Sequence, residues 1–394
     1  MRLDPSAWLD RPGVRRLLKA LDGKGGGNVR FVGGAVRDLL LGETPGDLDL
    51  ATSLSPQEVI LRLEEAGIKV IPTGIEHGTV TAISSGTIVE VTSLRSDVST
   101  DGRRATVAFT DDWREDAARR DFTINAIYAD PFTGELFDYF GGLEDLESRT
   151  VRFIGEPLQR IAEDHLRILR YFRFHARYGH GDPDARALAA CIARANDLMA
   201  LSRERVADEL LKLLSLADPT PTVVLMKDKG LFDPVVPEIQ NVDRLAILVE
   251  SERAAEIAPD PLRRLAALLP ADAAGAEKIA ARLKLSNKAR KRLGVAAELA
   301  LDTAPQVLAY RVGPVGAADR LLLAGKPAEA AAIVNWSPPR LPVGGGDLID
   351  RGVPQGPDVA RTLKRIEAEW IDAGFPMGPA VGRLVDQILK DRSR

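Results

Sequence analysis

A chain of 394 residues, with 45% hydrophobic and 28% charged residues, is long enough for two to four compact units with hydrophobic cores. No apolar stretch approaches bilayer-spanning length and residues 1–27 contain no uninterrupted apolar secretion segment, so we expect a cytoplasmic protein without a membrane partner. The single cysteine, Cys191, excludes an internal disulfide and a multi-cysteine zinc site, and the net charge of −4 argues against a globally basic, indiscriminate nucleic-acid-binding surface.

The first informative segment is residues 29–52, where we expect a strand, a short helix and a second strand. The strand Val29–Val32 leads into Gly33 and Gly34, which lack a Cβ and so allow the backbone to approach a phosphate closely. The short helix that follows carries Arg37, a cation suited to the same phosphate.

The second strand of this segment presents Asp47 and Asp49. Side chains two residues apart on a strand point to the same side, so these carboxylates converge. Two close carboxylates repel each other unless a cation lies between them, and their oxygens suit Mg²⁺, which shares its coordination shell with substrate phosphates. The segment therefore predicts a site for a nucleoside triphosphate and a metal ion.

The sequence from Phe31 to Thr52 closely resembles the signature of the DNA polymerase beta nucleotidyltransferase superfamily. The resemblance is to the branch that holds bacterial CCA-adding tRNA nucleotidyltransferases and poly(A) polymerases. It implies an α+β nucleotidyltransferase head followed by an all-α elongated arm. The expected domains are a catalytic head, a base-recognising neck, a body and a tRNA-binding tail, at residues 1–150, 151–215, 216–300 and 301–394.

Short β-rich segments continue the α+β pattern of the head. Strands are predicted at residues 68–71, 79–83 and 88–93, and the turn Ser84-Ser85-Gly86 joins the last two. From Glu156 onward the pattern is helical. Proline-rich breaks divide this helical part at residues 218–221, 234–237 and 338–339.

Glu90 lies on the third of these strands and has two interpretations. It is either a third acidic group beside Asp47 and Asp49 or a charged residue on a half-exposed strand, and the resemblance favours the first. Residues 95–109 are rich in turn formers and predict a mobile loop. The resemblance implies that this loop reshapes the site for the final A addition, while a passive surface loop is the alternative.

Residues 119–126, Arg-Arg-Asp-Phe-Thr-Ile-Asn-Ala, form a second motif. Adjacent arginines suit triphosphate charge, and Asn125 offers a donor and an acceptor for a ribose hydroxyl or a phosphate. The alternative is a charged helix start capped by Asp121. The match to the family's RRDFT-x-N motif implies that Arg120 is the phosphate ligand and Arg119 a support.

The third motif lies in residues 163–174, predicted to be a helix. Asp164, Arg167, Arg170 and Arg173 are three residues apart and form a stripe on that helix, where the arginines need anionic partners or water. A simple Asp164–Arg167 helical ion pair is the alternative. The match to the family's ED-x-x-R-x-x-R-x-x-R-F motif implies that Asp164 and Arg167 read the base, while Arg170 and Arg173 meet phosphate or ribose.

The chemistry of the bases supports this interpretation. Cytosine and adenine each place an amino donor beside a ring-nitrogen acceptor, which a carboxylate and a guanidinium complement. Uracil and guanine present a carbonyl and an N–H at those positions. One Asp/Arg couple can therefore accept CTP and ATP and reject UTP and GTP without a template.

Two weaker features lie downstream. The Gly356-Pro357 step predicts a helix start in a segment that resembles part of the family's helical arm. No histidine follows His180, which excludes a C-terminal His-Asp phosphohydrolase domain. The densest basic run is a candidate track for RNA phosphates or, equally, a solvated helix face; its cations are Arg282, Lys284, Lys288, Arg290, Lys291 and Arg292.

Together the motifs are similar to those of class II CCA-adding enzymes, which implies template-independent addition of CCA to tRNA from CTP and ATP with two Mg²⁺ ions on Asp47 and Asp49. The rivals are a poly(A) polymerase, a partial enzyme that adds only CC or only A, and a catalytically silent RNA-binding protein. Residues 73–79 have the form typical of the CCA-adding branch. The expected partners are tRNA, CTP and ATP, and no protein partner is implied.

Overall fold

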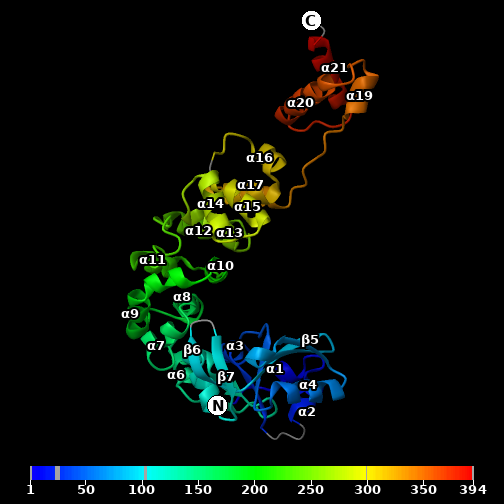
Figure 1. Cartoon of the computed structure of the whole chain (residues 1–394). Coiled ribbons are helices and arrows are strands. Elements are labelled where there is room, and N and C mark those ends of the chain that lie inside the picture. Colours follow the sequence, from blue (N-terminus) through cyan, green and yellow to red (C-terminus); the bar gives the residue numbers. More distant parts are fainter. Residues whose placement is uncertain (1, 23–26, 102–103, 299, 393–394) are drawn as a thin grey trace. The chain divides into compact units, whose positions relative to one another are not determined.

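The computed structural model describes residues 2–22, 27–101, 104–298 and 300–392. The chain divides into two compact units, unit 1 (Met1–Val235) and unit 2 (Val236–Arg394). Figure 1 shows strands only in the blue to cyan part of unit 1, whereas the green to red part of the chain is helical. The predicted order of an α+β head and an all-α arm is confirmed.

The head of unit 1 is built on a seven-stranded sheet in the order β3-β4-β5-β2-β1-β8-β9. Its central strands β2 and β5 are parallel, and every other neighbouring pair is antiparallel. The strands are β1 (Val29–Val32), β2 (Leu48–Thr52), β3 (Lys69–Gly74), β4 (Thr79–Ser84), β5 (Thr87–Ser93), β8 (Ile127–Ala129) and β9 (Leu136–Asp138).

The strand predictions for the head are confirmed within a few residues. The β4–β5 turn consists of Ser85 and Gly86, which both have positive φ, at 49° and 87°. Positive φ at both central residues defines the hairpin turn whose twist matches that of the flanking strands. The parallel register of β2 and β5 pairs Asp49 with Glu90, so their side chains lie on one face of the sheet.

The other face of the sheet is covered by the N-terminal helices. The indole of Trp8 packs against the ring of Phe31 on β1 with 4.6 Å between the ring centres, and both side chains are fully buried. Helix α4 packs against β3, β4 and β5, and Ser55 closes its N-terminus with a capping box. These covering helices are α1 (Ser6–Leu9), α2 (Val14–Asp22) and α4 (Pro56–Glu65).

Residues 95–109 differ from the predicted mobile loop. They form a β-hairpin of β6 (Arg95–Asp101) and β7 (Arg104–Phe109), with a register shift between Asp97 and Ser99. Thr106, Val107 and Phe109 in the second half have side chains that favour extended backbone, which the composition argument overlooked. Residues 102–103 lie outside the described part of the chain.

The remaining elements of unit 1 are helices. From Glu156 onward the described elements are all helical, as predicted. Within the described residues, no helix of either unit is both long and apolar enough to cross a bilayer. The elements are α3 (Gly34–Leu40), η1 (Ile75–His77), α5 (Trp113–Ala118), η2 (Thr123–Asn125), α6 (Gly142–Glu147), α7 (Pro157–Glu163), α8 (Leu166–Tyr178), α9 (Ala185–Ala193), η3 (Ala195–Ala200), α10 (Arg203–Leu214) and α11 (Thr220–Asp228).

Unit 2 is helical and starts within the predicted proline-rich break at residues 234–237. The break at 338–339 separates α18 from α19, and α20 begins at Pro357, as the Gly356-Pro357 step predicts. The helices are α12 (Asp243–Ala254), α13 (Pro261–Leu268), α14 (Ala273–Arg282), α15 (Asn287–Ala297), α16 (Pro305–Val312), α17 (Pro314–Leu323), α18 (Pro327–Val334), α19 (Gly345–Asp350), α20 (Pro357–Asp372) and α21 (Pro379–Arg392).

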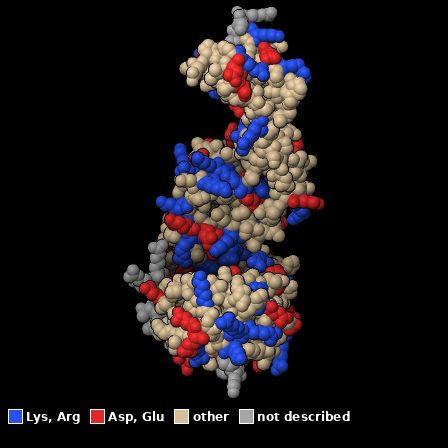
Figure 2. All heavy atoms as spheres, turned by 90° about the vertical axis from the view of Figure 1, so that its right-hand side faces the viewer, with Lys and Arg blue, Asp and Glu red and all other residues tan. Residues whose placement is uncertain are grey.

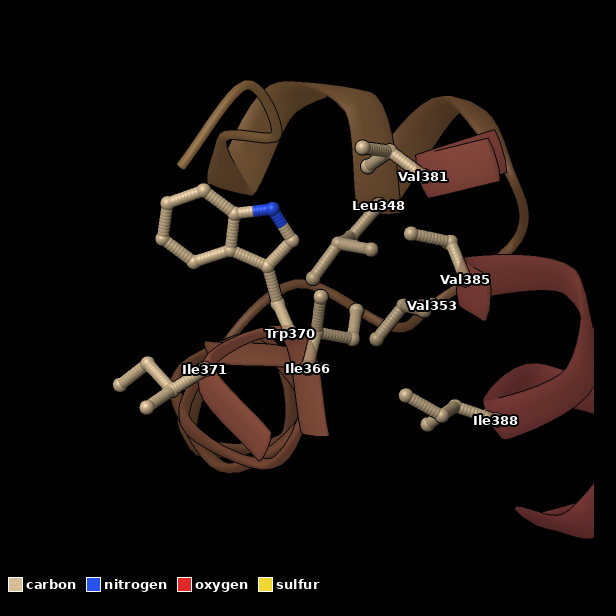
Figure 3. Close-up of a cluster of buried hydrophobic side chains, with 8 residues drawn as sticks. All are labelled: Leu348, Val353, Ile366, Trp370, Ile371, Val381, Val385 and Ile388. Atoms are coloured by element: carbon tan, nitrogen blue, oxygen red, sulfur yellow. The ribbon is translucent and has the colours of Figure 1, made fainter. Parts of the chain in front are cut away.

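The last three helices of unit 2 share a small hydrophobic core. Figure 3 shows Leu348 from α19, Ile366 from α20 and Val385 from α21 converging beside the Trp370 indole. The indole N–H donates to the Pro376 carbonyl at 2.7 Å, so its polar atom is satisfied. Packing among α19–α21 thus gives this end of the chain a core of its own.

The other helices of unit 2 enclose a network of buried charges. The Asp319 carboxylate is fully buried and accepts from Arg263 Nε at 2.9 Å and from Arg292 Nε at 2.7 Å. The carboxylate of Glu252 accepts from Arg263 Nη1 at 2.6 Å and from Arg264 Nε at 2.8 Å. Because every buried charge here has an opposite partner, the loss of one member leaves the others uncompensated.

Replacing Asp319 with alanine is expected to lower the free energy of unfolding of unit 2 by about 3–5 kcal/mol, because the guanidinium groups of Arg263 and Arg292 lose their shared carboxylate. Urea denaturation followed by circular dichroism measures the change. Glu329→Ala, which breaks a partly exposed pair with Lys326, is the control and should change stability by less than about 0.5 kcal/mol. Equal effects of the two substitutions would contradict the buried network.

Candidate active site

Gly33 marks the point where three parts of the head meet. It follows β1 and is the N-cap residue of α3, with φ 67°, a conformation that favours glycine. A Cβ at this position would lie 3.8 Å from Arg120 Nη1 and 4.0 Å from Asp49 Oδ2. The first glycine of the motif, an acidic residue and a predicted phosphate ligand are therefore neighbours, although they are distant in the sequence.

Arg37 is buried next to this glycine turn and its guanidinium is held in place by neighbours. Nε and Nη2 donate to Asp38 Oδ1 at 3.0 and 2.8 Å, and Nη1 donates to Asn125 Oδ1 at 2.5 Å. Its Cζ lies 4.1 Å from the centre of the Tyr178 ring, a cation–π contact from α8. A Cβ at Gly34 would lie 3.6 Å from Arg37 Nη2, so the guanidinium borders the glycine turn.

Arg120 is oriented by an acidic and an aromatic neighbour. Nη2 donates to Asp116 Oδ2 at 3.2 Å and Nε donates to the Tyr128 hydroxyl at 3.2 Å. Arg119 Nε donates to Asp116 Oδ1 at 2.8 Å, so one buried carboxylate holds both arginines of the motif. The remaining nitrogen of Arg120, Nη1, is the one that borders Gly33.

Three carboxylates gather on the open face of the sheet. Asp47 precedes β2 and is exposed, Asp49 lies within β2, and Glu90 is opposite Asp49 on β5. Burial, then the charge of Glu90 and to a smaller extent that of Asp47, raise the pKa of Asp49 to about 6, against the opposing effect of Arg120. Among the described residues, no three His, Cys, Asp or Glu side chains form a ready metal site.

Asp164 does not lie on the predicted continuous helix. Helix α7 ends at Glu163, α8 begins at Leu166, and Asp164 between them has extended backbone angles, φ −152° and ψ 107°. Its Oδ1 accepts from the Leu166 amide at 3.1 Å and its Oδ2 accepts from Arg205 Nη2 at 2.8 Å. The side chain of Asp164, one residue before the N-cap His165, therefore accepts from the first amide of α8, and such a local Asp–amide bond competes well with helix continuation.

The three arginines of the third motif, all on α8, have carboxylate partners. Arg167 Nη1 donates to Glu163 Oε2 at 2.5 Å, Arg170 Nη2 donates to Asp121 Oδ2 at 2.5 Å, and Arg173 Nε donates to Glu209 Oε2 at 2.6 Å. This confirms that the arginine stripe needs anionic partners. The alternative of an Asp164–Arg167 ion pair is not found among the described contacts, where each residue has another partner.

Asn125 is used within the protein. Its Oδ1 accepts from Arg37, and its Nδ2 donates to Asp121 Oδ1 at 2.9 Å, so the amide connects the glycine-turn arginine to the carboxylate that holds Arg170. Its predicted contact with ribose or phosphate stays a prediction. The chain of contacts from Arg170 through Asp121 and Asn125 to Arg37 joins α8 to α3.

A pocket of about 520 Å³ opens beside Asp164. It is lined by residues 162–165 at the α7–α8 break, by residues 200–202 and by Arg205 on α10. The pocket has negative charge from the carboxylates of Glu163 and Asp164 and positive charge from the guanidinium of Arg205. The predicted base-reading carboxylate thus borders a space of ligand size.

The basic run in unit 2 separates into two groups. The arginines form one group, because each has a carboxylate partner. Arg282 donates with both Nη atoms to Glu238, Arg290 Nε lies 3.9 Å from Glu277 Oε2, and Arg292 belongs to the buried network. For the lysines of this run, all exposed, the described contacts include no ion pair; they are Lys284, Lys288 and Lys291. Figure 2 shows Lys and Arg side chains gathered on one face at the height of α12–α15 in Figure 1.

Several side chains that hold the site were not predicted from the sequence. Asp38, Asp116 and Glu209 are buried carboxylates that pair with predicted arginines. Tyr178 and Arg205 act from α8 and α10, far along the chain. The only usable signal was the need of each buried arginine for an anion, which predicts a partner but not its position.

Comparison with known proteins agrees with these motifs. The family described as "Poly A polymerase head domain" matches residues 29–152, and the one described as "Probable RNA and SrmB- binding site of polymerase A" matches residues 182–242. Over 373 residues the chain is 36% identical to "CCA tRNA nucleotidyltransferase 1, mitochondrial" of Mus musculus, covering 90% of this chain and 85% of that protein. It is 42% identical over 204 residues to the CCA-adding enzyme of Geobacillus thermodenitrificans, covering 51% of this chain and 49% of that one.

A solved structure has the same fold over nearly the whole chain. The crystal structure of the Bacillus stearothermophilus CCA-adding enzyme in complex with CTP gives a TM-score of 0.79 at 27% identity. The match covers 97% of this chain and 99% of that chain. The similarity therefore extends through both units and is not confined to the head.

The raised pKa of Asp49 predicts a pH-dependent cost in stability for the chelator-treated protein. The pKa of Asp49 is about 6 in the folded chain, against an ordinary value of 3.8, so ionisation of Asp49 opposes folding. The resulting loss of stability develops as the pH rises from about 4 to about 6. Asp49→Asn should therefore be more stable than the parent above pH 6, by up to about 3 kcal/mol, and equally stable below pH 4.

Thermal unfolding in EDTA across pH 4 to pH 8 measures this difference. Asp10→Asn, at an exposed position, is the control for removal of a surface carboxylate. A stability gap between Asp49→Asn and the parent that stays constant over this range would contradict the electrostatic description of the three carboxylates.

Proposed function

The chain belongs to the CCA tRNA nucleotidyltransferase family, and we propose that it adds C, C and A to the 3′ end of tRNA from CTP and ATP, without a nucleic-acid template and with release of pyrophosphate. The observation that carries the proposal is the meeting of Gly33, Asp49 and Arg120 at one point of the head. A bare backbone turn, a carboxylate and a guanidinium are the groups that a triphosphate and its metal ion require.

The triphosphate is proposed to bind against the Gly33-Gly34 turn between Arg37 and Arg120. Both guanidinium groups are held by carboxylates, so they are oriented before the substrate arrives and lose little freedom when it binds. Arg120 Nη1 is directed to the turn and can donate to a phosphate oxygen without giving up the contacts of its other nitrogens.

The carboxylates of Asp47 and Asp49 are the proposed Mg²⁺ ligands, with Glu90 as an additional acidic group. Burial first, and then the negative charges of Glu90 and Asp47, raise the pKa of Asp49; a divalent cation would offset these charges, and the donor set of oxygens fits Mg²⁺. Two carboxylates suffice because Mg²⁺ completes its shell with water and substrate phosphates. Two Mg²⁺ ions held there by Asp47 and Asp49 would supply activation of the 3′-hydroxyl and neutralisation of the leaving pyrophosphate.

The base is proposed to be read by Asp164 and Arg167. In this structure Asp164 accepts from Arg205, Arg167 donates to Glu163, and both side chains are thereby oriented. Asp164, Arg205 and Glu163 line the pocket. A carboxylate that accepts from the amino group and a guanidinium that donates to the ring nitrogen select cytosine and adenine. Arg170 and Arg173 are proposed to lie near the sugar and phosphates.

The proposed domains are a head at residues 1–150, a neck at 151–215, a body at 216–300 and a tail at 301–394. The tRNA is proposed to contact the exposed lysines of the basic run, Lys284, Lys288 and Lys291, because the arginines of this run already have carboxylate partners. The β6–β7 hairpin is proposed to reshape the site for A addition. We keep the cytoplasm as the expected location, with the mitochondrion as the alternative that the mouse relative's name raises.

The activity is tested by offering the purified protein tRNA ends that lack CCA, CA or A, with labelled CTP and ATP separately and together. The expected result is completion of each end and no extension beyond it. Asp47→Ala and Asp49→Ala should lower both C and A addition by at least about 1,000-fold while tRNA binding stays nearly intact.

Product length separates the alternatives in this assay. Long A tracts would indicate a poly(A) polymerase, and an end stopped after CC or accepting only A would indicate a partial enzyme. Substantial incorporation by the Asp49→Ala variant at saturating Mg²⁺ would contradict the assignment of the carboxylates.

Replacing Asp164 with alanine is expected to relax base selectivity by roughly ten- to a hundredfold rather than to abolish catalysis. The substitution removes the proposed acceptor for the amino group, while Arg37, Arg120 and Asp49 remain on other elements. The measurement is kcat/KM for CTP, ATP, UTP and GTP. Unchanged rejection of UTP and GTP would show that another group reads the base.

A further inference from the structure

Arg160 on α7 reaches from the helical part of unit 1 into the head. Its side chain is buried, with the residue only 8% exposed. Nη2 donates to the backbone carbonyls of both Arg119 and Arg120, at 2.5 and 2.7 Å. The guanidinium therefore fixes the peptide segment that carries the proposed triphosphate ligand Arg120.

The same arginine is connected to the proposed base-reading side chain. Arg160 Nη1 pairs with Glu163 Oε2, the oxygen that also accepts from Arg167 Nη1. Arg167 Nη1 in addition donates to the Arg160 carbonyl at 2.8 Å, and its Nη2 donates to the Arg119 carbonyl at 3.3 Å. Arg160 and Arg167 thus share a carboxylate and a backbone carbonyl of the head.

Burying two guanidinium groups costs free energy if their role is only to hold α7 against the Arg119–Arg120 segment of the head. Two guanidinium groups lie on one carboxylate, and burial together with the charge of Arg167 lowers the pKa of Arg160. Apolar side chains would join α7 to the head without that cost. What apolar packing cannot do is fix the direction of a peptide carbonyl and of a neighbouring guanidinium at once, which the planar fork of arginine does.

We propose that Arg160 is a positioning residue that sets the spacing between the phosphate-binding Arg120 and the base-reading Arg167. The inference rests on the proposed function of these two arginines. A nucleotide that contacts both ends must match the distance between them, so a shift of one end relative to the other changes which base is accepted. Arg160 would act through its two neighbours and does not itself touch the substrate.

The variants that test this role are Arg160→Lys and Arg160→Gln. Lysine keeps the charge but presents a single ammonium that cannot reproduce the fork, and glutamine removes the charge. Arg186→Lys is the matched control, because Arg186 forms an exposed pair with Glu156 in the same region. All variants are compared with the parent at a temperature at which circular dichroism shows them folded.

For Arg160→Lys we expect kcat/KM for CTP to fall by roughly tenfold to a hundredfold, since small displacements of aligned groups are costly. The ratio of kcat/KM for CTP to that for UTP should fall by at least about fivefold, with a higher KM for CTP. Arg186→Lys should leave both quantities unchanged. If Arg160→Gln does not fold, Arg160→Lys alone decides.

A merely structural role predicts a different result. A lower unfolding temperature with an unchanged CTP-to-UTP ratio and an unchanged KM would overturn the proposal. The failure of the proposed function is distinguishable, because in that case the parent protein itself would not incorporate CTP or ATP into tRNA ends.

Discussion

The need of each guanidinium group for an opposite charge organises the catalytic part of this protein. Unit 1 brings arginines from the glycine-turn helix, from the segment after α5 and from α7 and α8 to one region, where water cannot solvate them fully. An isolated charge in such surroundings costs several kcal/mol, so each arginine comes with a carboxylate or a carbonyl. The buried and half-buried partners include Asp38, Asp116, Asp121, Glu163 and Glu209.

These pairs have a consequence for catalysis. An arginine that is already held donates with its remaining nitrogens in a fixed direction, which is the preorganisation that transfer of a charged group requires. The carboxylates of Asp47, Asp49 and Glu90 are arranged differently, because none of them forms an ion pair among the described contacts. Burial and the neighbouring carboxylates raise the pKa of Asp49 although Arg120 lies close to it, and this surplus of negative charge favours a divalent ion. One face of the sheet thereby combines oriented positive groups with concentrated negative charge.

The sequence predicted the head well and the contacts between distant segments poorly. The strand Val29–Val32, the Ser85-Gly86 turn and the Gly356-Pro357 helix start depend on local geometry, and the structure has them. The break of the helix at Asp164 was not predicted, because spacing alone does not distinguish a carboxylate inside a helix from one that accepts from the first amide of the next helix. The roles of Tyr178, Arg205 and Glu209 depend on tertiary packing that no local pattern encodes.

One nucleotide site is proposed to join the glycine turn of the head to the α7–α8 break. A crystal structure of the chain with CTP and Mg²⁺ tests it most directly through two distances. We expect the cytosine amino group within hydrogen-bond distance of an Asp164 carboxylate oxygen, about 3 Å, and phosphate oxygens within the same distance of Arg120 Nη1. A triphosphate bound away from Gly33 and Gly34, or a base that contacts neither Asp164 nor Arg167, would contradict it.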